Sequence, residues 1–354
     1  MKSSSLPLSI RISGYRGGHV QGIAMDQARQ SLYFSFTTEL VKTDLQGRVI
    51  GTVTGLAGHL GCIAYREEDG CVWGSLEYKH DTIGKGILSR MDRQEDVRDG
   101  FYLVVFDVSK IDRVGMDAEA DGVMRAVYLR EVVDDYTAPT HRYGCSGIDG
   151  VTFAPAPGKN DGLDLYVAYG IYGDPQRQDN DHQVLLRYRP EELLRDAAPL
   201  DQSDMHTQGP LSPDGKYFVY TGNTRYGIQN LEYDAAHGHM MAAVYTGQKP
   251  QYPNYDMYFI DCTRAAERKA LVGLDEMGDS LPLAPFGERD DATGLYGSRF
   301  PLGSTGMIAL GDGLYYFSTP FKDETGHGSE VCLYRQCGAT FCKVEAPITP
   351  EQQA

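Results

Sequence analysis

Five segments of the chain open in the same way: a histidine or a glycine leads into a short, mainly hydrophobic run and then a polar turn. Each segment continues into an aromatic-rich strand. The five openings are residues 19–24, 59–64, 147–152, 227–232 and 303–308. Such a spaced recurrence indicates a repeat architecture, because one unit cannot bury its hydrophobic face alone and must stack on its neighbours.

Each repeat divides into short strands separated by turn residues, and four-stranded antiparallel units repeated around a centre form a β-propeller. The sequence therefore predicts an all-β, five-bladed propeller made by one domain over residues 1–354. The predicted blades are approximately 19–55, 59–133, 147–224, 227–274 and 303–346. An alternative with six blades remains open, since residues 206–220 resemble a further first and second strand.

The outer strands are less regular in sequence than the inner ones. We expect the fourth strands of blades 2, 3 and 4 at 124–132, 216–222 and 269–273. Residues 8–13 alternate hydrophobic and polar side chains and are expected to join the outer edge of the last blade. Residues 319–329 are expected to form a loop.

The chain of 354 residues carries a formal net charge of -16, which disfavours binding to nucleic acid and to anionic membranes. No hydrophobic run is long enough for a signal peptide or a membrane span, so a cytoplasmic location is predicted. The seven cysteines include no CxxC pair, and most are expected to be free thiols. Cys337 and Cys342 flank a turn and would pair in an oxidising compartment.

In a propeller the first strand of each blade lines the central channel. The aligned positions at the mouth of the channel are Gln21, Gly61, Asp149, Gln229 and Thr305, with His19 and His59 two residues before the first two. This polar ring would hold a hard cation through oxygen ligands or orient a polar ligand. The alternative is a channel that contains water only.

Four residues are candidates for catalysis. Asp149 is the one carboxylate of the ring, and Glu77 ends the second strand of blade 2 on the same face. Two carboxylates facing one funnel are typical of acid and base work in glycoside cleavage. His19 and His59 are expected to act as proton shuttles or, together with Asp149, as metal ligands. The alternative for Glu77 is an ion pair with Lys79.

Most long loops fall on the face at which the chain enters the inner strands, which we call the top face, and loops on a rigid scaffold often carry binding residues. The candidate substrate-binding residues are Gln21, Tyr143, Tyr172, Arg225, Gln229 and Asn230. Side-chain amides and an arginine at this face suit recognition of hydroxyl or carboxylate groups. The alternative for them is hydrogen bonding between blades.

Two further motifs are assigned to the surface. His237-Gly238-His239 has the spacing of a metal-binding pair but lies in a short turn on the opposite face, where solvent exposure is expected. The acidic run 174–181 lacks the glycine and terminal glutamate of an EF-hand loop and is expected to be a solvated loop.

The inner-strand phrases Ile148-Asp149-Gly150-Val151 and Gln229-Asn230-Leu231 resemble those of calcium-dependent propeller hydrolases of the SMP-30 and gluconolactonase type. The resemblance covers a few residues in each blade, and that family is six-bladed. It implies a divalent cation, calcium or another, held at the channel axis by acidic and asparagine side chains.

The sequence thus favours an enzyme that acts on a small polar substrate, a carbohydrate or its lactone, by hydrolysis or elimination in the central funnel, with or without a metal. The alternative is a non-catalytic propeller that binds a glycan or a protein partner on the same face. Long, tyrosine-rich loops are compatible with both.

Overall fold

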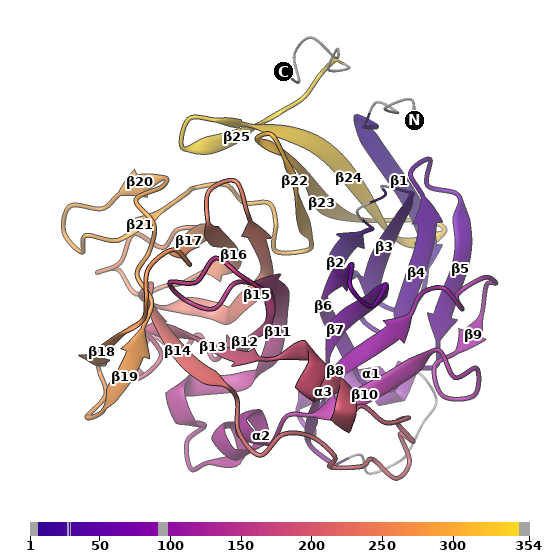
Figure 1. Cartoon of the computed structure of the whole chain (residues 1–354), viewed down its shortest axis with the longest axis horizontal. Helices are drawn as coiled ribbons and strands as arrows, with labels where there is room; N and C mark the ends of the chain where they lie inside the picture. Colours follow the sequence, from indigo (N-terminus) through magenta and orange to yellow (C-terminus); the bar gives the residue numbers. More distant parts are fainter. Residues whose placement is uncertain (1–5, 27, 29, 91–97, 347–354) are drawn as a thin grey trace.

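The hydrophobic segments form strands that pair with neighbouring strands in sheets, because the backbone donors and acceptors of a buried segment must find hydrogen-bond partners. In the computed structural model, which describes residues 6–26, 28, 30–90 and 98–346, five mainly antiparallel sheets stand around a common axis (Figure 1). The protein is a five-bladed β-propeller, as predicted. Whether 1–354 is one domain stays a prediction.

Blades 1 and 2 are the most regular. Blade 1 contains β2 (Val20–Met25), β3 (Ser31–Phe36), β4 (Glu39–Asp44) and β5 (Val49–Thr54), with the short β9 (Met116–Asp117) added in parallel to β5. Blade 2 contains β6 (His59–Arg66), β7 (Cys71–Tyr78), β8 (Gly100–Asp107) and β10 (Met124–Tyr128). The insert between β7 and β8 contains helix α1 (Thr82–Arg90).

The predicted fourth strand of blade 2 is too long. The strand β10 ends at Tyr128, and helix α2 (Arg130–Thr137) follows it. Val132 and Tyr136, four residues apart, are both buried in α2. Residues at that spacing lie on one face of a helix, and this pattern decides the conformation of the segment.

Blade 3 contains β11 (Cys145–Ala154), preceded by the 3-10 turn η1 (Arg142–Gly144), and then β12 (Asp164–Ile171), β13 (His182–Tyr188) and β14 (Gly215–Tyr220). Helix α3 (Pro190–Asp196) connects β13 to β14. The predicted fourth strand at 216–222 is therefore confirmed. The six-bladed alternative is wrong, because β14 completes blade 3 instead of opening another blade.

Blade 4 contains β15 (Thr224–Asp234), β16 (His239–Thr246) and β17 (Met257–Asp261). Its predicted fourth strand at 269–273 is wrong. The strand β18 (Glu267–Ala270) pairs with β19 (Met277–Ser280), which runs parallel to β14 of blade 3. Every residue of β18 is exposed, so no hydrophobic face holds it against β17. A small hairpin of β20 (Glu288–Arg289) and β21 (Tyr296–Gly297) follows.

Blade 5 closes the ring with both ends of the described chain. It contains β22 (Met307–Gly311), β23 (Leu314–Asp323) and β24 (Gly326–Cys337). The outer edge of β24 pairs with β1 (Ser9–Tyr15) along one half and with β25 (Thr340–Lys343) along the other. The predicted closure by residues 8–13 is thus confirmed.

The predicted loop at 319–329 is instead the far end of the β23–β24 hairpin. The antiparallel register continues without a break to the pair Asp323 and Gly326. Continuous pairing satisfies the backbone groups of this segment, which a loop would leave to solvent.

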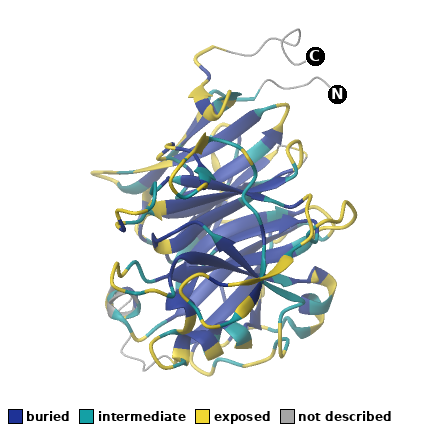
Figure 2. Cartoon of the chain, turned by 90° about the vertical axis from the view of Figure 1, so that its left-hand side faces the viewer, coloured by how far each residue is buried: buried dark blue, intermediate teal, exposed yellow. Residues whose placement is uncertain are grey.

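Buried residues follow the strands, and exposed residues gather in the connections (Figure 2). Aromatic contacts join neighbouring blades, as when the Trp73 ring of β7 meets Phe153 of β11 edge-on at 5.9 Å. Such packing stabilises the blade interfaces. Among the described residues, no helix is both long and apolar enough to cross a membrane.

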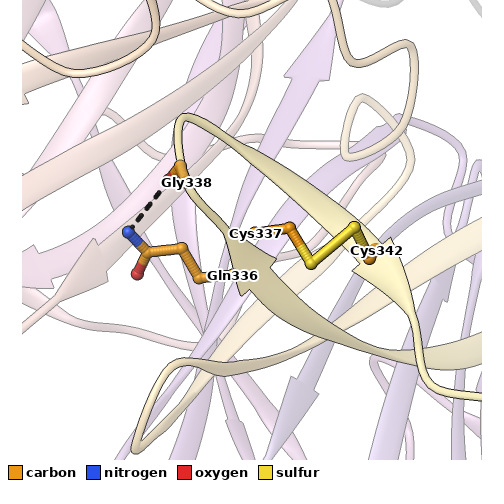
Figure 3. The surroundings of a disulfide bond; sticks show 4 residues. All are labelled: Gln336, Cys337, Gly338 and Cys342. Carbon is orange, nitrogen blue, oxygen red and sulfur yellow. Dashed lines mark hydrogen bonds between the residues drawn. A yellow bond between two sulfur atoms is a disulfide. The ribbon is translucent and has the colours of Figure 1, made fainter.

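Cys337 and Cys342 form a disulfide between β24 and β25 (Figure 3). Next to it, the Gln336 side-chain amide donates a hydrogen bond to the Gly338 carbonyl at 3.2 Å. The other five cysteines are free and buried, as the sequence predicted for most of them.

Candidate active site

Four of the five residues of the predicted polar ring lie at irregular points of the inner strands, and Thr305 precedes β22. The pairing register shifts at Gln21 in β2, at Gly61 in β6, at Asp149 in β11 and at Gln229 in β15. A β-bulge inserts unpaired residues and re-aims their side chains. The recurring bulge is the reason that these aligned positions gather at the axis.

A cavity of about 440 Å³ lies at the top of the channel, within the size range of small-molecule sites. All four predicted catalytic residues line it, together with two of the predicted substrate-binding residues. Its polar and charged lining consists of His19, Gln21, Thr37, His59, Glu77, Lys79, Ser146, Asp149, Tyr226, Gln229 and Tyr245. The sequence predicted that residues from four blades lie close together, and in the structure they line one cavity.

Glu77 is held by three partners. Its Oε1 lies 2.5 Å from Lys79 Nζ and 3.6 Å from His59 Nδ1, and its Oε2 accepts a hydrogen bond from the Ile148 amide at 3.1 Å. Burial would raise the pKa of Glu77, but Lys79 and His59 hold that pKa below its usual value. Glu77 is therefore a buried, ionised carboxylate, paired with Lys79 as the alternative interpretation of the sequence expected.

Two carboxylates, Glu77 and Asp149, act on the imidazole of His59. Burial would lower the pKa of its imidazole, but Glu77 and Asp149 raise that pKa above its usual value. No hydrogen bond reaches its buried Nδ1 in the described structure. The raised pKa favours the protonated form of His59.

Asp149 is half-buried on the cavity wall and has only one side-chain hydrogen-bond donor among the described residues, Gln229 Nε2, at 3.2 Å from Oδ2. Burial raises the pKa of Asp149 to about 7, and the nearby charge of Glu77 acts in the same direction. The cations at His59 and Lys79 oppose this shift. A carboxyl group that titrates near neutral pH is suited to exchange protons with a substrate.

Two tyrosines that sequence reasoning did not select form the rim of the cavity. Tyr226 and Tyr245 are 46% and 36% exposed, and their rings meet edge-on at 6.4 Å. Tyr226 has a φ of 62°, a conformation that is uncommon for residues with a side chain and that clusters at functional sites. Only the density of tyrosines and amides in 220–233 signalled Tyr226 in the sequence, and Tyr245 lies outside that segment.

The other predicted substrate-binding residues do not line the cavity. Asn230 is buried and donates to the carbonyls of Gln21 and Ser304, so it joins inner strands, as the alternative expected. Tyr143 is buried against Phe218, and Arg225 is exposed outside the cavity. Tyr172 lies in an aromatic group with His141.

The predicted metal ligands at the axis are not grouped as ligands usually are. Gln21 Nε2 lies 3.3 Å from Nε2 of the exposed His19 and also donates to Thr37. Within the described residues, the set of three possible ligands that converges is a different one, Asp234, His237 and His239. Thr305, the fifth ring position, is turned toward blade 5, where its hydroxyl donates to Ser318 O.

A second cavity of about 460 Å³ lies beside blade 1. Its charged lining residues are Arg16 and Glu39, and Glu39 Oε1 accepts a hydrogen bond from the Gly17 amide at 2.8 Å. Ile87 of α1 lines both cavities, so this helix lies between them. The axial cavity holds the convergent titratable groups and is the stronger candidate for chemistry.

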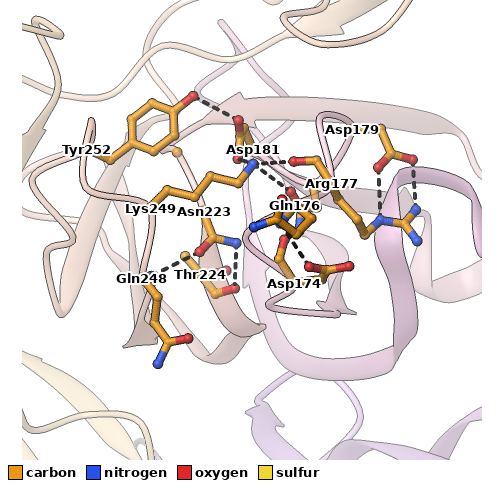
Figure 4. Close-up of polar contacts among 12 residues, drawn as sticks. Asp174, Gln176, Arg177, Asp179, Asp181, Asn223, Thr224, Gln248, Lys249 and Tyr252 are labelled. Carbon is orange, nitrogen blue, oxygen red and sulfur yellow. Dashed lines mark hydrogen bonds and ion pairs between the residues drawn. The ribbon is translucent and has the colours of Figure 1, made fainter.

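A second charged cluster lies in the top-face loops of blades 3 and 4 (Figure 4). Lys249 Nζ contacts Asp181 Oδ1 at 2.6 Å and Asn180 Oδ1 at 2.9 Å, and Tyr252 donates to Asp181 Oδ2 at 2.8 Å. Asp181 and Asn180 are buried, so the prediction of a solvated loop is wrong at the end of 174–181. The cluster is fully paired and joins two loops.

The comparisons with known proteins concern the fold. No protein-family model matches the chain, and no curated protein matches it. Similar solved structures include the β-propeller domain of Cps50 (Swd1) from Myceliophteria thermophila, with 11% identity, a TM-score of 0.32, and coverage of 92% of this chain and 99% of that one.

Two other similar structures have names that refer to sugars. A GH43 β-1,3-galactosidase with galactodeoxynojirimycin has 12% identity and a TM-score of 0.40, and the match covers 89% of this chain and 90% of that one. A gluconolactonase from Xanthomonas campestris has 11% identity and a TM-score of 0.38, with 95% and 89% covered. At these values the likeness is one of fold, so function has to be argued from the site.

Proposed function

We propose that the axial cavity is the active site of an enzyme that acts on a small polar substrate, a carbohydrate or its lactone, by hydrolysis or elimination. The observation that carries the proposal is Asp149, a half-buried carboxyl group on the cavity wall whose pKa is raised to about 7 beside His59. Both reactions begin with a base that takes a proton, from water or from a carbon next to a carbonyl. A base is most effective when its pKa lies near the working pH.

In this mechanism Asp149 is the general base and His59 the proton donor. Ionised Asp149 accepts the proton of the attacking water or of the substrate, and protonated His59 passes its proton to the leaving oxygen. Glu77 is a positioning residue, since Lys79 and the Ile148 amide already occupy its oxygens. Its charge keeps His59 protonated.

Substrate recognition is assigned to the rim and the ring. The Tyr226 and Tyr245 rings offer apolar faces at the mouth of the cavity, which suit the flat side of a sugar ring. The amides of Gln21 and Gln229 line the wall below and can exchange hydrogen bonds with hydroxyl groups. The cavity thus combines apolar surface with a few directed polar groups.

The test is hydrolysis or elimination measured with a panel of sugar lactones and aryl glycosides. Asp149→Asn is expected to lower kcat about 10²- to 10⁴-fold, the usual contribution of a general base. The matched control is Asp291→Asn, which removes a carboxylate that is 95% exposed. If Asp149→Asn retains the activity of the wild type, the proposed role of Asp149 is wrong.

The pH profile adds a second readout. Because Asp149 acts in its ionised form, kcat/KM is expected to rise with pH through about 7 and to fall again as His59 loses its proton. The two limbs belong to the coupled pair and not to one residue. A profile that decreases through pH 7 with no rising limb would show that Asp149 acts as an acid instead.

A binding protein is the second candidate, favoured by the exposed tyrosine pair at the rim. In that case glycans bind with no turnover, and Tyr226→Ala weakens binding while Asp149→Asn leaves it unchanged. A divalent cation at the axis stays a prediction, and turnover measured with and without a chelator tests it. The cytoplasmic location also stays a prediction.

A further inference from the structure

The face opposite the axial cavity carries a group of three possible metal ligands at the end of blade 4. Asp234 is the last residue of β15, His239 is the first of β16, and His237 lies in the turn between them. Their ligand atoms all lie within 4.8 Å of one another. The sequence prediction of exposure is correct for His237 but wrong for His239, which is 4% exposed.

The hairpin geometry brings the three residues together. Asp234 and His239 are the last cross-strand pair of β15 and β16, so their side chains lie on the same side of the sheet. His237 Nδ1 lies 2.8 Å from Asp234 Oδ2, and the two imidazole rings stack at 5.2 Å with an interplanar angle of 16°. Backbone hydrogen bonds from His237 and Gly238 to Asp234 O hold the turn in this shape.

The surroundings of the group resemble the outer shell of a metal site. The Tyr315 hydroxyl of blade 5 donates to Asp234 Oδ2 at 2.5 Å, a contact of the kind that orients a ligating carboxylate. Phe259 and Phe286 pack edge-on against His239 at 5.1 and 5.5 Å. This aromatic wall excludes water on one side, while the exposed His237 leaves access on the other.

The donor set decides the type of ion. Two imidazoles and one carboxylate suit zinc and similar divalent transition metals, whereas calcium and magnesium prefer oxygen ligands only. Three protein ligands leave a further position for water or another molecule.

We infer that Asp234, His237 and His239 form a binding site for a divalent transition metal, with zinc the best fit, on the bottom face of blade 4. The site is independent of the proposed active site, because Asp234 lies five positions after Gln229 in β15, a span of roughly 16 Å along an extended strand. A bound ion would link the three side chains of the β15–β16 hairpin to one another. The hydrogen bond from Tyr315 to the ligating aspartate connects this hairpin to blade 5.

The test is zinc binding to tag-free protein by titration calorimetry, with cobalt absorption as the spectroscopic signature of the ligand geometry. The wild type is expected to bind one zinc ion per chain. His237→Gln changes an exposed side chain, so it should fold normally and yet lose most of this affinity. Tyr315→Phe is expected to weaken binding about tenfold or more, as loss of an orienting partner usually does.

Two variants serve as controls. His80→Gln removes an exposed histidine elsewhere and should bind zinc as the wild type does. Asp149→Asn should also bind normally, since it changes only the axial cavity. If no zinc binds, or if His237→Gln binds zinc unchanged, the inference is overturned. Loss of binding in Asp149→Asn with retention in His237→Gln overturns it too and places the ion at the axis.

Discussion

At the scale of single residues, the absence of a side chain at two glycines makes room for the carboxylates of the site. A Cβ at Gly147 would lie 2.0 Å from Glu77 Oε2, and a Cβ at Gly61 would lie 2.8 Å from Asp149 Oδ1. Real side-chain atoms do not approach so closely, so any larger residue would displace the acids. Gly147 also has a φ of 135°, which only glycine adopts at low cost.

Gly147→Ala is therefore expected to destabilise the protein by more than the backbone strain alone, which costs about 1–3 kcal/mol. The variant should also lose the hydrogen bond that the Ile148 amide donates to Glu77. Urea denaturation measures the stability. The matched control is Gly162→Ala, where φ is 69° but no atom lies within 4 Å of the added Cβ. Equal losses in both variants would mean that Glu77 moves aside without cost.

At the scale of the elements, the β-bulges and the top-face loops place the functional groups. The inner strands β2, β6, β11 and β15 each interrupt their pairing near the channel mouth, and each interruption turns one or two residues out of the ladder. The loops are in turn fixed to each other. Lys249 and Asp181, both under 5% exposed, join the loop before β13 to the loop after β16.

Breaking this ion pair should be costly, because one charge would remain buried without a partner. Lys249→Met is expected to lower the free energy of unfolding by about 3–5 kcal/mol. The double variant Lys249→Met, Asp181→Asn removes both charges and is expected to recover part of that loss. Denaturant midpoints of the wild type, both single variants and the double variant measure the coupling. A double variant no more stable than Lys249→Met would contradict the pairing.

At the scale of the whole molecule, stability depends on how the ring is closed. The strand β1 comes from the start of the described chain and pairs with β24 near its end, so it links blade 5 to blade 1. Its side chains alternate: Ile10 and Ile12 are buried, while Ser9 and Arg11 are exposed. This alternation was already visible in the sequence at 8–13.

Ile10→Ala and Ile12→Ala are each expected to destabilise the protein by about 2–5 kcal/mol, the usual cost of truncating a buried isoleucine. Ser9→Ala, an exposed position in the same strand, should change stability by less than about 0.5 kcal/mol. Thermal or chemical denaturation of the three variants provides the measurement. Small effects at both isoleucines would show that β1 does not contribute to closure.

The sequence by itself determined the repeat and the inner strands, favoured five blades over six, and placed Gln21, Asp149 and Gln229 at the channel mouth. These features depend on short-range hydrophobic patterns and on positions that recur in every unit, so neighbouring residues encode them. It also predicted that Asp149, Glu77, His19 and His59 lie close together, because their places within the repeat fix their places at the axis, and all four line the axial cavity.

Only the tertiary structure decided the features that depend on contacts between distant segments. In the folded protein β18 lies at the edge of blade 3 and not in blade 4, Asp181 is buried against Lys249, and Asn230 hydrogen-bonds between inner strands. Tertiary contacts also place Asp234 beside His237 and His239 and pack aromatic rings against His239. Burial and pairing arise from what surrounds a residue in space, and a linear pattern does not contain that information.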